Sequence, residues 1–142
     1  MFHDHRTDVD GLSPADLRSE YDADLAAAVE AAGVDRAAEA ADVERSTVEA
    51  LVAGDAPDLT LAAAAAIQAL DPDAPDADTL VEMACEHLLL GMTTGVMDVD
   101  AVARELAIDL DPKEVQQKIE RRAPMTFDEF VHVQHAIAGR QP

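Results

Sequence analysis

Helix-starting and helix-ending residues recur at short intervals along the sequence, and this most constrains the fold. Gly33, Gly54 and Gly139 stand where helices are predicted to end. No stretch alternates apolar and polar residues over the length of a strand. Four aromatic residues and many alanines supply a core without large rings. We therefore predict an all-α fold of seven or eight short, closely packed helices.

Capping signals predict where the helices begin. Ser13 is interpreted as an N-cap, with Pro14 in the first turn and Asp16 near the positive end of the helix dipole. Further pairs match the capping-box pattern, in which an N-cap side chain and a carboxylate three residues later bond reciprocally. These pairs are Ser46 with Glu49, Thr79 with Glu82, Asp111 with Glu114, and Thr126 with Glu129.

The same signals divide the chain into segments. Residues 1–12 are polar and predicted to be flexible. Residues 13–70 form an N-terminal helical half, and 71–78, "DPDAPDAD", form an acidic linker with two prolines. Residues 79–142 begin with an apolar helix, "LVEMACEHLLLGM", which we interpret as a central strut before a second set of helices.

The second set repeats the first. Placing Val48 on Val115 aligns the loop and helix start that follow in the two halves. With one residue dropped, "APDLT…IQ" in the first half corresponds to "APMT…VQ" in the second. The aligned pairs are Val52 and Ile119, Pro57 and Pro124, Leu59 and Met125, Thr60 and Thr126, Ile67 and Val133, Gln68 and Gln134, and Val34 and Val99.

The stretch "AAEAADVERSTVEALVAGDAPDLTLAAAAAIQAL" resembles the phage-repressor and Cro-like helix-turn-helix family. The matching positions are the small residue Ala38, the apolar Val43 and Val48, the helix-ending Gly54, and Pro57 before the "LTL" run. The resemblance covers about residues 25–70 and, more weakly, 98–138. It implies two helix-turn-helix-like repeats.

Three residues depart from that family's pattern. Asp42 replaces the turn glycine, and Asp tolerates the left-handed conformation that the turn needs. Val52 and Ala53 stand where the family has polar residues. The whole chain also resembles an uncharacterised haloarchaeal family of small acidic proteins, a resemblance that implies no activity.

Charge supports the haloarchaeal resemblance. The formal net charge is −20, from 30 acidic and 10 basic residues. An acidic, lysine-poor, alanine-rich composition is typical of haloarchaeal cytosolic proteins, in which acidity serves solvation. No apolar run approaches the length of a membrane span, so we expect a cytoplasmic protein. The one cysteine, Cys85, excludes an intrachain disulfide and is predicted to be a buried thiol.

Affinity for DNA comes mainly from Lys and Arg, and the first repeat lacks them. Its second helix offers Arg45 beside Glu44 and Glu49, so we interpret that helix as structural or as a protein contact. The second repeat carries "DPKEVQQKIERRAPM", which contains both lysines of the chain. Gln at the start of such a helix can pair with adenine. The candidate DNA-binding residues are Lys113, Gln116, Gln117, Lys118, Arg121 and Arg122.

A bland alternative stays open for the same helix. Glu114 and Glu120 lie at spacings that pair with Lys113, Lys118 or Arg121, and a salt-bridged surface needs no ligand. We therefore expect a binding protein, acting either as a transcriptional regulator that contacts DNA through the helix around 112–122 or as a helical protein-interaction module. A homodimer is compatible with both functions.

Other chemistry has weaker support. His3 with the N-terminus could bind Cu²⁺, and Asp128, His132 and His135 share a helix face that could hold zinc. The wet face of a helix explains the second group equally well, so we assign no metal and no cofactor. No Gly-rich phosphate loop and no distinctive nucleophile–base pair is found. We expect no enzyme activity and identify no small-molecule substrate.

Overall fold

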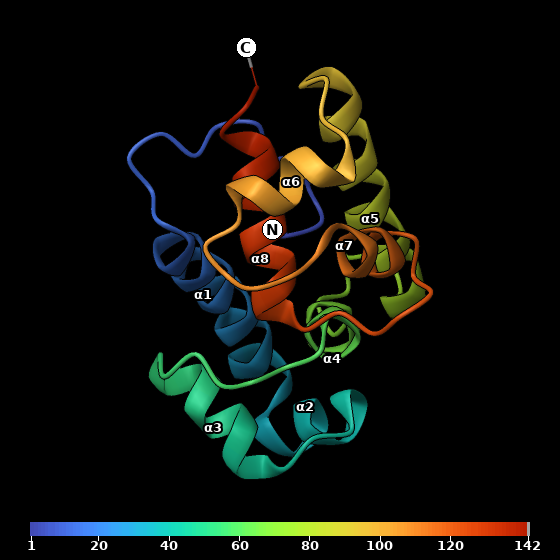
Figure 1. Ribbon diagram of the computed structural model, residues 1–142. Coiled ribbons are helices and arrows are strands. Elements are labelled where there is room, and N and C mark those ends of the chain that lie inside the picture. Colours follow the sequence, from blue (N-terminus) through green and yellow to red (C-terminus); the bar gives the residue numbers. More distant parts are fainter. Residues whose placement is uncertain (142) are drawn as a thin grey trace.

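The computed structural model describes residues 1–141, and these form eight helices, as the all-α prediction requires (Figure 1). No helix in this range is long and apolar enough to cross a lipid bilayer. The predicted second half extends to Pro142, which lies outside the described residues. The helices are α1 (Pro14–Ala32), α2 (Val34–Ala41), α3 (Arg45–Ala53), α4 (Leu61–Gln68), α5 (Ala77–Thr94), α6 (Val99–Glu105), α7 (Pro112–Ile119) and α8 (Phe127–Ala138).

Several predicted helix ends are confirmed. Ser13 caps α1 and its capping box is completed by Asp16. The predicted boxes at the starts of α7 and α8 are both formed, with reciprocal bonds between side chains and backbone. Gly54 ends α3 in the left-handed conformation, with φ of 83°, which glycine adopts without steric cost.

Two predicted capping boxes are wrong. Glu44, rather than Ser46, occupies the N-cap of α3, and Glu49 accepts a hydrogen bond from the Arg45 side chain at 2.8 Å. Asp76 caps α5 by accepting a bond from the backbone N–H of Thr79 at 2.8 Å. Asp is as good an N-cap as Thr, so α5 starts before the predicted signal.

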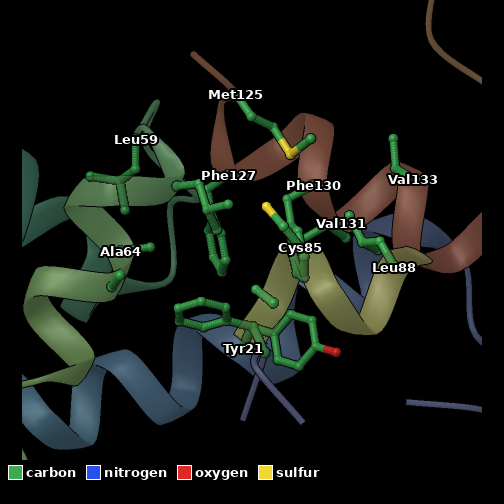
Figure 2. Packing of buried hydrophobic residues seen from close by; sticks show 14 of the residues in the cluster. Tyr21, Leu59, Ala64, Cys85, Leu88, Met125, Phe127, Phe130, Val131 and Val133 are labelled. Atoms are coloured by element: carbon green, nitrogen blue, oxygen red, sulfur yellow. The ribbon is translucent and has the colours of Figure 1, made fainter. Parts of the chain in front are cut away.

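Part of the N-terminal segment predicted to be flexible is packed into the core. The Phe2 side chain is 1% exposed, and its ring contacts Tyr21, Phe127 and Phe130 edge-on. Figure 2 shows the last three rings gathered among the buried residues. Burial of Phe2, together with that of His3 and Val9, offsets the entropy lost by ordering this polar segment.

The two halves meet at equivalent positions. Thr60 and Thr126 form an antiparallel bridge: the Leu61 N–H donates to the Met125 carbonyl at 2.9 Å, and the Phe127 N–H donates to the Leu59 carbonyl at 2.8 Å. Exchanging the halves in the predicted repeat converts each of these bonds into the other. The pairing is what an approximate two-fold axis through this bridge requires.

Helices α1 and α5 are also equivalent. The sequence pattern indicated a central strut for α5 and did not predict this equivalence. α1 packs on α3, α4 and α8, and α5 packs on α7, α8 and α4, as a two-fold exchange demands, whereas the contact of α1 with α2 has no counterpart between α5 and α6 within the described residues. Their buried positions coincide in register: Leu17 with Leu80, Tyr21 with Ala84, Asp22 with Cys85, Leu25 with Leu88, Ala28 with Gly91, and Val29 with Met92. The structure is therefore two four-helix halves, α1–α4 and α5–α8.

Helix α8 lies at the centre of the molecule. Eight of its 12 residues are buried, and it contacts α1, α4, α5 and α6 (Figure 1). The buried residues of both halves form one core cluster. At Gly91 the approach of α5 to α8 is so close that a Cβ would lie 2.6 Å from Ile137.

The helix pairs that resemble helix-turn-helix units differ in their connections. Residues 42–44 join α2 to α3, within the length of a helix-turn-helix turn. Asp42 adopts the left-handed conformation expected of it, with φ of 54°. Residues 106–111 join α6 to α7, which is a longer connection. The tight turn therefore belongs to the first half, and the cationic helix to the second.

The buried pair Tyr21 and Gln134 provides a test of the packing between α1 and α8. The Tyr21 hydroxyl donates to Gln134 Oε1, and both side chains are almost fully buried. We expect Tyr21→Phe to lower the free energy of unfolding by about 1–3 kcal/mol because the amide oxygen loses its partner. Chemical denaturation of Tyr21→Phe, Gln134→Leu and the double variant measures the effect, and losses that simply add would contradict the pairing.

Candidate binding surface

Helix α7 carries the predicted DNA-binding residues, and the structure does not bring all six together. Val115 and Ile119 anchor its inner side in the core. Lys113, Gln116, Arg121 and Arg122 are exposed, whereas Gln117 and Lys118 are half-buried. The cations must therefore be considered one by one.

Lys118 belongs to a structural ion pair. Its Nζ lies 2.9 Å from Glu129 Oε1 and donates to the Pro124 carbonyl at 2.9 Å. Burial alone would raise the pKa of Glu129, but hydrogen bonds from the Thr126 backbone and from Lys118 lower it below its ordinary value. Lys118 thus ties α7 to the start of α8, and its charge is not presented to solvent.

Glu120 places a carboxylate in the middle of the candidate surface. It accepts a hydrogen bond from Gln116 at 3.1 Å and pairs with Arg122. Lys113 and Arg121 are exposed and form no ion pair within the described chain. Two cations beside a carboxylate form a weaker phosphate-binding surface than the sequence suggests, because the carboxylate repels a polyanion.

In the first repeat, too, carboxylates neutralise the cation of the corresponding helix. Arg45, the cation of α3, pairs with both Asp35 and Glu49. The sequence interpretation of α3 as structural or as a protein contact stays a prediction.

An apolar surface adjoins α7 on the side of Glu120. Leu89 and Leu90 on α5 are 46% and 50% exposed, and Val96 just beyond the helix is 89% exposed. Between α5 and α7 lies a groove of about 330 Å³ lined by apolar side chains and edged by carboxylates. We call it the α5–α7 groove; it is lined by Leu89, Met92, Asp98, Val99, Gln116, Ile119 and Glu120.

Sequence reasoning missed this surface although a signal was available. The run Leu88-Leu89-Leu90 lies in the apolar helix interpreted as a central strut, but successive residues on a helix point in directions about 100° apart. Three successive residues therefore span about 200° of the helix surface, which is wider than a single buried face. Leu88 is buried, and Leu89 and Leu90 are exposed.

The histidines considered as metal ligands have other contacts. His135 Nε2 bonds to the Leu12 carbonyl at 2.6 Å, and His132 Nε2 lies 3.6 Å from Asp128. The His3 ring is buried, and its carbonyl accepts a bond from His87 Nδ1 at 2.6 Å. Across residues 1–141, no group of three His, Cys, Asp or Glu residues is arranged to hold a metal ion.

Comparison with known proteins identifies the family of the chain. The sequence pattern of a family of unknown function, DUF5791, matches residues 17–140. The chain belongs to this family. The match runs from the first turn of α1 through α8 and so includes both halves of this DUF5791 chain. No curated protein and no solved structure gives a significant match.

Removing the Lys118 charge should weaken the fold. We expect Lys118→Ala to lower the free energy of unfolding at neutral pH by about 1–3 kcal/mol, because Glu129 loses a buried partner. The lowered pKa of Glu129 contributes stability above its unfolded-state value, which is lost as pH falls through the folded value.

Lys118→Ala should therefore also flatten the acid limb of the stability curve. Thermal unfolding between neutral and acidic pH measures both effects, with exposed Lys113→Ala as the control. An unchanged acid limb would mean that Lys118 does not hold Glu129 ionised.

Proposed function

We propose that this protein is a non-catalytic, helical protein-interaction module that binds its partner at the α5–α7 groove. The observation that carries the proposal is the exposed apolar side chain of Leu89, which lines that groove, with Leu90 and Val96 also exposed on the same helix and just beyond it. Exposed large apolar side chains beside an apolar groove mark a surface that a partner can cover.

The charge of the surface selects the partner. Asp98 and Glu120 edge the groove, and the chain as a whole carries a net charge of −20. A second copy of the chain would be repelled, whereas a basic segment would be attracted and steered. We therefore propose a basic amphipathic helix of another protein, whose apolar side fills the groove.

DNA binding through α7 is a second candidate. It is favoured by the exposed, unpaired Lys113 and Arg121 and by the resemblance of the repeats to helix-turn-helix proteins. Two features oppose DNA binding. Glu120 places a carboxylate on the same surface, and the charge of Lys118 is held in an ion pair with Glu129. We rank it below the protein-interaction function for that reason.

Replacing the exposed leucines tests the groove. We expect Leu89→Ser with Leu90→Ser to abolish binding of a synthetic basic amphipathic helix, measured by fluorescence anisotropy in KCl, while leaving the fold intact. Val52→Ser is the matched control, because Val52 is an exposed apolar residue on α3, with 38% of its surface accessible.

The controls distinguish the candidates. At about 0.1 M KCl an acidic helix of the same apolar pattern should bind much more weakly than the basic one, and the difference should shrink as KCl is raised and screens the charges. Equal binding of both helices at the lower salt concentration, or undiminished binding by the Leu89/Leu90 variant, would contradict the proposal. Crosslinking to DNA in cells, with discrete sites lost in Lys113→Ala/Arg121→Ala, would instead establish the regulator.

We further propose that the protein works in concentrated salt, as its resemblance to haloarchaeal proteins suggests. A net charge of −20 on 142 residues repels itself in dilute buffer. Raising KCl from about 0.1 M to about 1 M shortens the screening length from about 10 Å to about 3 Å. We expect the unfolding temperature to rise steeply over this range, and a flat dependence would oppose this part of the proposal.

A further inference from the structure

A second cavity lies on the other side of α7 and shares no lining residue with the α5–α7 groove. Its volume is about 370 Å³, within the range of small-ligand sites. Its walls come from the start of α4, the first half of α5 and residues 118–125. Cys85, whose pKa is raised by burial, lies on the α5 wall, and Figure 2 shows it with Met125 among the buried core residues.

The two-fold relation explains why the space exists. In the first half the buried side chain of Arg18 fills the part of the equivalent space beside Pro57 and Phe127, and a cavity of about 350 Å³ remains beside Asp22 and Gly54. Its guanidinium bonds Asp22 at 2.9 Å and the Pro57 carbonyl at 2.6 Å, and lies over the Phe127 ring. Val81 is the residue equivalent to Arg18, and it is too short to reach across.

The partners of Arg18 are replaced as well. The equivalents of its neighbours all line the cavity: Cys85 for Asp22, Pro124 for Pro57, Leu61 for Phe127, and Ala62 for Asp128. The second half has thus exchanged a buried ion pair for an apolar cavity of the same location. Lys118 satisfies the Pro124 carbonyl from outside, so the cavity has no unmet acceptor at that point.

The rim of the cavity is cationic, which is unusual in this chain. Lys118, Arg121 and Arg122 line it, and no described lining residue is acidic, although Lys118 pairs with Glu129 and Arg122 with Glu120, both outside the lining. By contrast, the cavity between α1 and α3, the cavity at the end of α5 and the α5–α7 groove each include a carboxylate, as expected of a chain with 30 acidic and 10 basic residues. Arg121, with no ion pair in the described chain, is free to meet an anion.

The backbone at Arg121 adds an independent observation. Arg121 has φ of 62°, the left-handed conformation that glycine adopts most easily. Its equivalent in the first half is Gly54, also left-handed. The second half therefore carries a guanidinium where the conformation favours glycine, and strain of this kind concentrates at binding sites.

We propose that this cavity binds a small organic oxyanion, a carboxylate or phosphate ester with a short apolar tail. The tail occupies the space between Val81, Cys85 and Leu61, and the head group pairs with Arg121 at the rim. Arginine suits such a head group because its planar donors bond two oxygens at once.

Hexanoate and hexyl phosphate are the probes, with 1-hexanol lacking the charge and acetate lacking the tail. Because Cys85 is the one cysteine of the chain, its alkylation by iodoacetamide reports occupancy by mass spectrometry. Either hexyl anion should slow alkylation in a saturable way, and 1-hexanol and acetate should not at equal concentration. Calorimetry of the same titrations gives the affinities.

Substitutions separate binding from folding. Arg121→Gly removes the cation and relieves the left-handed strain, so we expect hexanoate affinity to fall about tenfold, the scale of one lost charge-assisted bond, with no drop in unfolding temperature. Exposed Arg36→Ala on α2 is the matched control and should bind as the parent does.

Filling the cavity is the complementary test. Val81→Arg with Cys85→Asp rebuilds the first-half ion pair, and calorimetry should then detect no hexanoate binding. Val81→Phe serves the same purpose without burying a charge. Saturable binding that survives Arg121→Gly and the filled variants, or no protection of Cys85 by either anion, would overturn the proposal.

Discussion

The two backbone hydrogen bonds between residues 59–61 and 125–127 are the constraint on which the rest of the structure depends. Each segment immediately precedes a helix, so the bridge places the starts of α4 and α8 side by side. Their threonines complete the arrangement by capping both helices. With the two starts joined, α1 packs against α8 and α5 against α4, and neither half closes its core alone.

The differences between the halves matter more for function than their likeness. The first half fills the space beside its helix-exit loop with Arg18 and Asp22, at 5% exposure each, and its left-handed helix end is glycine. The second half has apolar residues and a cavity at that location, with Arg121 at the helix end. A duplicated fold can keep one half as scaffold while the other acquires a site, and this distribution of charge fits that division.

The two proposed binding surfaces, the α5–α7 groove and the cavity beside Cys85, lie on either side of α7. The α5–α7 groove is apolar with carboxylates at its edge, and the cavity beside Cys85 is apolar with cations at its rim. Opposite charges on neighbouring surfaces select different ligands, a basic partner for the first and an anion for the second. Lys118 and Glu129 hold α7 in position between them.

Much of the fold was predictable because its determinants are local. Capping residues, helix-ending glycines and the repeated "APDLT" and "APMT" loops lie within a few residues of what they control. The equivalence of α1 and α5 was not predicted because equivalent positions share burial rather than residue type. Asp22 corresponds to Cys85, and Tyr21 corresponds to Ala84.

The candidate site was less predictable because its determinants are distant in sequence. Spacing on a helix offered Lys118 several partners, but only the fold brings Glu129 and the Pro124 carbonyl to it. Docking of Phe2 depends on aromatic residues on α1 and α8. The cavity exists because the short Val81 stands where the first half has the long Arg18. That equivalence is recognisable only once the two-fold relation is known.

Native-state hydrogen exchange in KCl tests the two-fold pairing most directly. If the bridge joins two halves that share one core, the amides of Leu61 and Phe127 exchange together, at the free energy of global unfolding, as do the core amides of α1 and α5. Exchange of one half at a distinctly lower free energy, with the Leu61 and Phe127 amides following it, would show that the halves fold separately and would contradict this structure's central claim.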